Sequence, residues 1–285
     1  MRHGGKILID QLEAQGATTA FTVPGESFLA ALDGLYDSNR MRTIICRQEG
    51  GAAIMAEAWG KMTGDPGICF VTRGPGAANA MSGLHIAQQD STPLVMFLGL
   101  PGAEHEDREA FQEIDTKGVF SSFVKWSAVI RDTQRIPEYV SRAFHTARSG
   151  RPGPVVLGLP EDMLSAERDA REGKPAQVAI PAPRAADMAA IEAAIAKAER
   201  PIMIIGGPGW SVDVQKKVEA FAKRFDLPVM ASFRCQDYFD NRHPNYCGHA
   251  GLGLDAKLAE AIKSADLLIA MGARLGEIKI GRAHV

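Results

Sequence analysis

Short apolar segments of strand length alternate with segments of helical periodicity along most of the chain, and this alternation restricts the fold more than any other feature. Strands are predicted at residues 19–23, 43–46, 67–72, 94–98, 123–130, 155–159, 202–205, 228–231 and 267–271. Helices are predicted at residues 7–12, 28–35, 52–61, 136–148, 186–198, 212–225 and 256–262, and another ends at residue 88. Such alternation is typical of α/β folds, in which helices cover both faces of a mostly parallel sheet.

The chain of 285 residues is long enough for two α/β domains, because domains average about 150 residues. Residues 166–184 are rich in charge and then in proline, which is typical of a linker between domains. The strand–helix pattern resumes after this segment. We therefore expect two consecutive three-layer, parallel-sheet domains, at residues 1–165 and 185–278.

Composition and charge argue against several classes of protein. The formal net charge is -2 and there is no basic stripe, so we expect no nucleic-acid or anionic-membrane partner. No apolar run approaches the roughly 18 residues that span a bilayer, and the N-terminus lacks the apolar region of a secretory signal. The four cysteines show no CxxC spacing, which favours reduced thiols in a cytoplasmic protein.

Glu49 lies where the predicted strand at residues 43–46 gives way to the predicted helix at residues 52–61. Ligand sites in open α/β sheets gather at the carboxyl ends of strands. Glu49 is therefore either a first-turn acid that the helix dipole stabilises by up to about 1 kcal/mol, or a group that faces a ligand and transfers a proton. Its position alone leaves both interpretations open.

Two glycine-containing turns also follow predicted strands. Their candidate residues are Pro24 and Gly25 in the first turn, and Gly74, Pro75, Gly76 and Asn79 in and after the second. Glycine lets a ligand approach the backbone, and a helix N-terminus attracts anions, although such turns are often only structural. The chain has no GxGxxG sequence, so a dinucleotide fingerprint is not supported.

Few other residues stand out as catalytic candidates. The sequence contains no P-loop, no HExxH and no Ser-His-Asp order. His85 and Gln112 are polar candidates that a pocket could include, although a lone helical histidine is more often structural.

One loop contains two cysteines and two histidines, with the spacing C-x7-H-x3-C-x-H from Cys235 to His249. Structural zinc sites usually begin with a pair of ligands two to four residues apart. The single residue between Cys247 and His249 is too short for that arrangement. We therefore expect no metal here, and an irregular surface or cofactor-facing connection instead.

The last residues, 279–285, follow no strand or helix pattern and stop where another strand–helix step is expected. Residues 280–285 are what ATC GGA AGA GCA CAC GTC encodes, which resembles a sequencing adapter read in frame. We therefore expect a non-native tail on a truncated reading of a longer protein.

Several motifs occur in a specific order. They are Pro24-Gly25, Arg47-Gln48-Glu49-Gly50-Gly51-Ala52-Ala53, Thr72-Arg73-Gly74-Pro75-Gly76-Ala77-Ala78-Asn79, Asp90-Ser91-Thr92-Pro93, Phe111-Gln112-Glu113 and Gly150-Arg151-Pro152-Gly153-Pro154. The series resembles thiamine-diphosphate enzymes of the acetolactate synthase and pyruvate oxidase type. The resemblance implies a pyrimidine-binding domain at residues 1–165 and a truncated, Rossmann-like central domain at residues 185–278, which holds FAD in some members.

The resemblance also implies roles for individual residues. The glutamate that matches Glu49 hydrogen-bonds N1′ of the cofactor's aminopyrimidine, which promotes loss of the thiazolium C2 proton before a 2-oxo acid is attacked. Pro24, Gly25, Gly74, Pro75, Gly76 and Asn79 match the cofactor side, and Phe111, Gln112 and His85 the substrate side. The family implies a homo-oligomer, a dimer or tetramer, and a Mg²⁺ ion whose ligands lie in a third domain.

The chain departs from acetolactate synthases at Gln48, Gly50, Glu26 and Arg73, where the family usually has His, Gln, Gly and Ser. The central glutamate is kept while its neighbours change, which favours the cofactor chemistry and leaves the substrate open. The alternatives are a decarboxylase or acyltransferase of the same family with another 2-oxo or acyl substrate, and a non-catalytic nucleotide-binding α/β protein.

Overall fold

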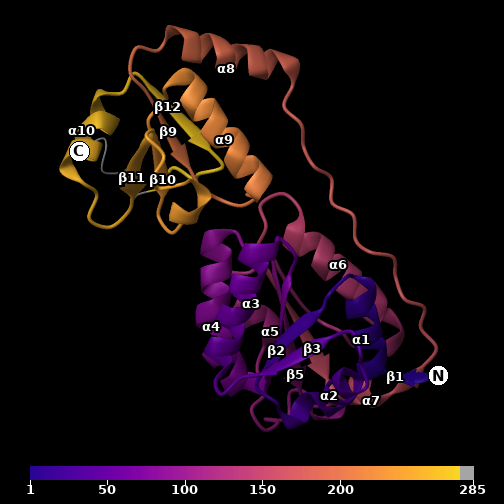
Figure 1. Cartoon of the computed structure of the whole chain (residues 1–285). Helices are drawn as coiled ribbons and strands as arrows, with labels where there is room; N and C mark the ends of the chain where they lie inside the picture. The colour runs from indigo at the N-terminus through magenta and orange to yellow at the C-terminus, as the bar shows by residue number, and fades with distance from the viewer. Residues whose placement is uncertain (277–285) are drawn as a thin grey trace. The chain divides into compact units, whose positions relative to one another are not determined.

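The structure is a computed structural model in which residues 1–276 are described. The expected tail, residues 279–285, lies outside the described residues. The chain divides into two compact units, Met1–Ala179 and Ile180–Val285, each with its own sheet (Figure 1).

Unit 1 contains a parallel sheet and a two-residue antiparallel pairing of β1 (Arg2–His3) with β8 (Glu167–Arg168). The other strands are β2 (Thr19–Thr22), β3 (Arg42–Ile45), β4 (Gly67–Thr72), β5 (Leu94–Leu100), β6 (Trp126–Val129) and β7 (Pro154–Pro160). The helices are α1 (Gly4–Ala14), α2 (Leu29–Tyr36), α3 (Glu49–Thr63), α4 (Arg73–Asp90), α5 (Thr116–Phe120), α6 (Ile136–Arg148) and α7 (Glu161–Ser165).

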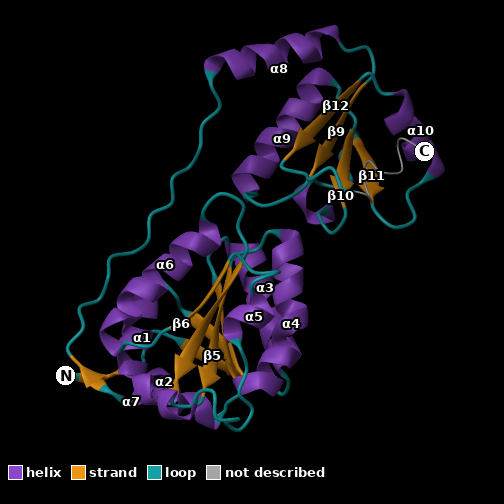
Figure 2. Cartoon of the chain, turned by 180° about the vertical axis from the view of Figure 1, so that it is seen from behind, coloured by secondary structure: helices purple, strands orange, loops and turns teal. Residues whose placement is uncertain are grey.

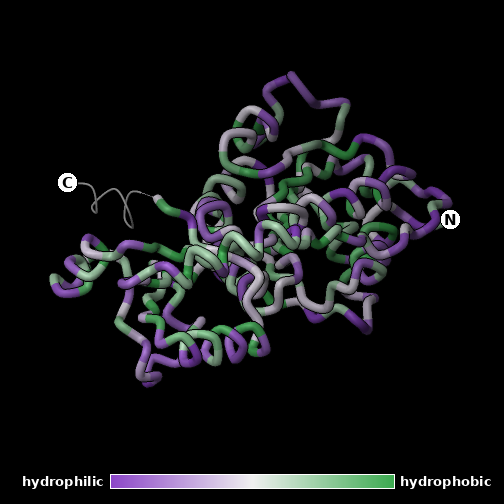
Figure 3. The backbone as a smooth tube through the Cα atoms, turned by 90° about the horizontal axis from the view of Figure 1, so that it is seen from above, coloured by the Kyte–Doolittle hydropathy of each residue, from purple (hydrophilic) through white to green (hydrophobic). Residues whose placement is uncertain are grey.

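The six strands of the main sheet have the order β3-β2-β4-β5-β7-β6, and all neighbours are parallel. In the centre of the sheet, Val95 and Phe97 face one core and Met96 and Leu98 face the other, as the two-residue period of a strand requires. Helices α1, α2 and α6 supply the first core, and α3, α4 and α5 supply the second. Hydrophobic and hydrophilic stretches consequently alternate along the backbone (Figure 3).

The segment expected to be a linker begins as part of unit 1. Residues 169–184 have no regular secondary structure (Figure 2). Gln11 Oε1 nevertheless accepts a 2.6 Å hydrogen bond from Gly173 N, and Gln15 Oε1 accepts one of 2.8 Å from Ala176 N. The side-chain amide of Gln15 also donates to the Lys174 carbonyl at 2.9 Å. The side chains of two buried glutamines of α1 therefore form the hydrogen bonds of the backbone at residues 173–176, where a neighbouring strand could otherwise form them.

Unit 2 contains a four-stranded parallel sheet in the order β11-β10-β9-β12. Its strands are β9 (Pro201–Ile205), β10 (Val229–Ser232), β11 (Tyr246–Ala250) and β12 (Leu267–Met271), and its helices are α8 (Ala185–Lys197), α9 (Val212–Phe225) and α10 (Ala256–Ser264). α9 packs on one face of the sheet, where Val218 and Ala222 are buried, and α10 packs Leu258 on the other.

The predicted α/β fold with parallel sheets is confirmed, and two predictions on individual elements are wrong. Strand β11 lies in the segment that was expected to be an irregular connection, because Tyr246–Ala250 contains no β-branched residue to reveal it. The strand predicted at residues 123–130 is shorter, since Phe123 and Val124 still bond to the Phe120 carbonyl of α5. Of the described helices, none is long and apolar enough to cross a membrane.

Candidate functional site

The carboxyl ends of the parallel strands of unit 1 all reach the same edge of the sheet, and most candidate residues follow them there. The turn after β2 contains Pro24 and Gly25, α3 begins at Glu49 after β3, and α4 begins at Arg73 after β4. The segment after β5 contains Phe111 and Gln112. This edge is where open α/β sheets bind ligands.

Glu49 is the first residue of α3, and its position depends on the close packing of α3 against α4. Gln48 caps the helix, since its side-chain oxygen accepts a 2.9 Å hydrogen bond from Gly51 N. Glycines allow the two helices to approach, because a Cβ on Gly83 would lie 2.5 Å from the Ala53 Cβ. The side-chain amide of Asn79, on α4, thereby reaches Glu49 Oε2 and donates a 2.9 Å hydrogen bond.

Gly76 lies beside the other oxygen of the Glu49 carboxylate. A Cβ on Gly76 would stand 3.5 Å from Glu49 Oε1 and 3.5 Å from Thr72 Cγ2. Among the described residues, Glu49 Oε1 has no hydrogen-bond partner. The half-buried carboxylate therefore has one oxygen bound by Asn79 and the other on the side of Gly76, which adds no side chain there.

The turn after β2 packs against Thr72, the last residue of β4. A Cβ on Gly25 would lie only 2.5 Å from the Thr72 Cβ, so this position requires glycine. Ser27 Oγ and Thr72 Oγ1 share a 2.6 Å hydrogen bond. The structure thus brings Gly25, Gly76, Asn79 and Glu49 together around Thr72 and the first turns of α3 and α4.

Arg73 joins three further segments at this edge. Its Nη1 donates to the Phe111 carbonyl at 3.2 Å, and its Nη2 pairs with Glu161 Oε1 at 2.5 Å. Its Nη1 also lies 3.6 Å from Glu26 Oε1. Arg73 and Glu26 depart from the family pattern in the sequence, but neither was predicted to belong to the site. The sequence feature that could have revealed their role is an arginine at a strand-to-helix turn, where small residues are usual.

A cleft of about 260 Å³ opens beside Arg73. It is lined by Arg73, Pro101, Gly102, His105, Arg108, Ala110, Phe111 and Glu161. The sequence did not predict this cleft, because its walls come from segments between residues 73 and 161.

The remaining candidates lie less centrally. Pro24 is exposed in the turn after β2, and Pro75 is exposed in the first turn of α4. His85 is exposed six residues after Asn79 on α4, about 9 Å further along the axis at 1.5 Å per residue. No hydrogen bond or ion pair joins His85 to the other candidates among the described residues.

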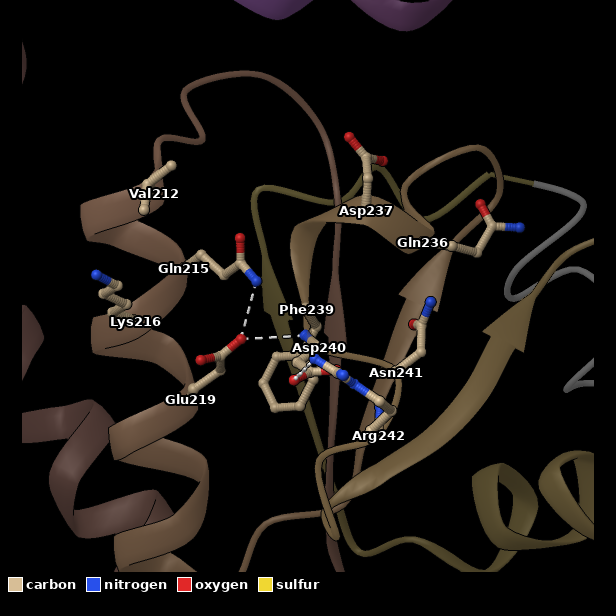
Figure 4. A pocket seen from close by; sticks show the side chains of 10 residues that line it. All are labelled: Val212, Gln215, Lys216, Glu219, Gln236, Asp237, Phe239, Asp240, Asn241 and Arg242. Atoms are coloured by element: carbon tan, nitrogen blue, oxygen red, sulfur yellow. Dashed lines mark hydrogen bonds and ion pairs between the residues drawn. The ribbon is translucent and has the colours of Figure 1, made fainter.

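Unit 2 has a polar pocket of about 570 Å³ between α9 and the segment of residues 236–242 (Figure 4). Glu219 Oε1 accepts hydrogen bonds from Gln215 Nε2 at 2.9 Å and from Asp240 N at 3.0 Å. Asp240 pairs with Arg242 at 3.0 Å. Glu219, Asp240 and Arg242 are therefore held by contacts among residues of the pocket itself. Across residues 1–276, no cluster of three or more His, Cys, Asp or Glu side chains suits a metal ion.

Comparison with known proteins places both units in one group. Residues 2–119 match a family model described as "Thiamine pyrophosphate enzyme, N-terminal TPP binding domain", and residues 188–284 match "Thiamine pyrophosphate enzyme, central domain". The acetolactate synthase large subunit of Corynebacterium glutamicum is 31% identical over 278 residues, which are 96% of this chain and 44% of that protein.

Two similar proteins come from Escherichia coli. The large subunits of acetolactate synthase isozymes 2 and 1 are each 31% identical to this chain, over 285 and 283 residues. Each alignment covers 99% of this chain, but 51% and 50% of the relatives. The chain therefore spans about half the length of the curated relatives that it matches.

Proposed function

The chain belongs to the thiamine pyrophosphate enzyme family, and we propose that it contributes Glu49 to the thiamine diphosphate site of an acetolactate synthase-like enzyme. Such an enzyme decarboxylates a 2-oxo acid and joins the product to a second substrate. The observation that carries the proposal is the Glu49 carboxylate, which has one oxygen bound by Asn79 and the other beside Gly76. All of these residues lie in the segment matched by the cofactor-binding family model.

The residues at this edge fit a flat heteroaromatic ring. Gly76 adds no side chain beside Glu49 Oε1, where a methyl group would stand in ordinary contact at 3.5 Å. The turn at Gly25 packs against Thr72 and also presents no side chain. A ring nitrogen placed beside Glu49 Oε1 would meet a carboxyl group able to give or accept a proton.

The proposed role of each residue follows from its contacts. Thiamine diphosphate, when bound, supplies the electron sink that decarboxylation of a 2-oxo acid needs. Glu49 would hold a proton against a ring nitrogen of the bound cofactor, and proton transfer there would be general acid–base chemistry. Asn79 fixes the carboxylate rotamer through Glu49 Oε2. Phe111 and Gln112 form the substrate side, together with the cleft beside Arg73.

Two further ligands are proposed for the full-length protein. We expect Mg²⁺ to accompany the cofactor's diphosphate. FAD is the candidate ligand of unit 2, at the glycine turn 206–209, where a Cβ on Gly209 would meet nothing within 4 Å. Flavin fluorescence during a titration with FAD tests the second proposal.

Self-association of the full-length protein and a cytoplasmic location are also proposed. The outer surfaces of α3 expose Ile54, Met55 and Met62, with Met62 87% exposed. An apolar surface of this kind favours a homodimer or homotetramer. All four cysteines are free thiols, which fits a reducing compartment.

The substrate is the least constrained part of the proposal. Arg73 and Glu26 form an ion pair at the candidate site, where the family resemblance leads us to expect Ser and Gly. This difference favours, as the second candidate, a decarboxylase or acyltransferase of the same family with another 2-oxo or acyl substrate.

The test uses the full-length protein with thiamine diphosphate and Mg²⁺. We expect cofactor-dependent consumption of pyruvate, release of CO₂ and formation of acetolactate, and loss of all three in Glu49→Gln. Glu138→Gln is the matched control, since Glu138 is also a first-turn helix acid but lies on α6. Retained turnover in Glu49→Gln would contradict the assigned role, and turnover of a different 2-oxo acid would favour the second candidate.

A further inference from the structure

The segment between β5 and α5 has an unusual backbone. Asp107, Glu109 and Gln112 have φ values of 61°, 54° and 60°, in the left-handed region that side chains other than glycine rarely adopt. Three such residues within six positions cost free energy, so surrounding contacts must hold the segment. We call residues 101–113 the strained loop.

The first part of the strained loop is held by carboxylates. Glu113 accepts hydrogen bonds from Asp107 N at 2.9 Å and from Ala110 N at 3.1 Å. Asp162 Oδ1 accepts one from Ala103 N at 2.9 Å. Arg131 pairs with Glu106. These contacts do not reach the Phe111–Gln112 peptide, around which a 3.0 Å hydrogen bond from Glu113 N to the Ala110 carbonyl closes a turn.

The end of the strained loop is held by the first turn of α4. Arg73 Nη1 donates to the Phe111 carbonyl at 3.2 Å, and Gly74 N donates to the Gln112 carbonyl at 2.9 Å. The Arg73 guanidinium lies 5.9 Å from the centre of the Phe111 ring. Gly74 permits this approach, because a Cβ there would lie 3.0 Å from the Gln112 carbonyl oxygen.

Arg73 is itself fixed. Its side chain is only 11% exposed and its Nη2 pairs with Glu161 at 2.5 Å. Its own φ is 29°, so its backbone is also in the left-handed region. Arg73 and Glu161 both line the cleft of about 260 Å³ that Phe111 borders.

We propose that Arg73, paired with Glu161, is a positioning residue: it holds the Phe111 carbonyl beside the left-handed backbone of Gln112 and so sets the substrate side of the cleft. A serine at this position would make neither the bond to Phe111 nor the ion pair. The inference rests on the proposed function, since Phe111 and Gln112 are its substrate-side residues. Arg73 thereby contributes to substrate selection in a way that a small residue at this position cannot.

The first experiment measures hydrogen exchange and needs no substrate. In Arg73→Ser, we expect exchange of the Gly74 amide and of residues 110–113 to rise about tenfold, because the contact that closes the loop is lost. Arg73→Lys, which keeps the charge but not the planar fork, should give a smaller rise. Arg135→Ser is the control, because it removes a different Arg–Glu pair, with Glu138 at 2.8 Å. Thermal melting verifies that each variant folds.

Unchanged exchange of the Gly74 amide in a folded Arg73→Ser variant would overturn the positioning role. A rise that Arg135→Ser reproduces would also overturn it, because the effect would then be general.

The second experiment measures steady-state kinetics of the full-length protein with thiamine diphosphate and pyruvate. We expect Arg73→Ser to raise KM about tenfold while kcat changes less than about threefold, with partial recovery in Arg73→Lys. An unchanged KM would overturn the role in substrate selection. Wild-type protein that consumes no 2-oxo acid would contradict the proposed function, whereas the exchange result would still decide what Arg73 does to the loop.

Discussion

The side-chain amide of Asn79 donates a 2.9 Å hydrogen bond to Glu49 Oε2, and this bond joins the second turn of α4 to the first residue of α3. It exists because glycine and alanine at the contact let the two helices approach. The bond leaves Glu49 Oε1 on the side of Gly76. The orientation of the proposed proton-transfer group is therefore set by a residue on another helix.

Replacement of Asn79 tests this dependence. In Asn79→Ala we expect kcat/KM for the 2-oxo acid to fall about tenfold, since a hydrogen bond to a charged group contributes about 1.5 kcal/mol or more. Asn79→Asp should be worse, because it places a second carboxylate against Glu49. The measurement is steady-state kinetics of the full-length protein. Equal activity in the Ala and Asp variants would show that Asn79 does not act through the Glu49 carboxylate.

Gly76→Ala tests the space beside Glu49 Oε1. The added methyl group would meet its nearest neighbours at 3.5 Å, which is an ordinary contact, so the fold should tolerate it. We expect the melting temperature to change little while thiamine diphosphate affinity, measured by titration calorimetry of the full-length protein, falls at least about tenfold.

Gly51→Ala is the matched control for Gly76→Ala. Gly51 lies in the first turn of α3, and a Cβ there would meet nothing within 4 Å. This change should leave the affinity unaltered and raise stability by up to about 1 kcal/mol. A similar loss of affinity in both variants would contradict a role for the space at Gly76.

The sequence allowed the fold class and the place of Glu49 to be predicted, because both depend on local patterns. The two-residue period of the strands and the 3.6-residue period of the helices reflect burial on sheet faces. The position of Glu49 could be predicted because it lies at a strand-to-helix junction. The ordered motifs then linked Gly25, Gly76 and Asn79 to Glu49.

The contacts of Arg73 could not be predicted in this way. They join residues 26, 73, 111 and 161, and no local pattern specifies which carbonyl or carboxylate a guanidinium reaches across the sheet edge. The packing of residues 173–176 on α1 was missed for a similar reason. A charged, proline-rich composition indicates a linker, but it does not show that two distant glutamines satisfy the backbone of that segment.

The hydrogen bonds between α1 and residues 173–176 lead to a prediction on stability. Gln11→Leu or Gln15→Leu leaves backbone groups of this segment without partners, and each should lower the free energy of unfolding of unit 1 by roughly 1–3 kcal/mol. Trypsin should then cleave faster after Arg171, whereas the bond between Lys174 and Pro175 resists trypsin in every variant. Gln134→Leu, at an exposed glutamine, is the control. Unchanged cleavage in the Gln11→Leu, Gln15→Leu double variant would show that the glutamines do not hold the segment.

The thiols provide a test of the described packing without any substrate. Cys46, Cys69 and Cys235 are buried and Cys247 is exposed. Burial raises the pKa of the Cys69 thiol strongly, with a further contribution from the charges of Cys46 and Glu49. Since the thiolate is the reactive form, Cys69 should resist alkylation in the native protein. Cys247 should be modified first.

The rate at Cys247 should depend on pH in a defined direction. Partial burial also raises the pKa of this thiol, although a backbone hydrogen bond opposes the shift. The thiolate fraction at pH 8 is therefore below that of a free cysteine, and alkylation should accelerate as the pH rises from 8 to 9. Mass spectrometry after timed exposure to iodoacetamide measures each site, and urea-unfolded chain supplies the reference rate. Modification of Cys69 as fast as Cys247 in folded protein would contradict the packing of β4 between its neighbouring strands, because only an open sheet would give the reagent access.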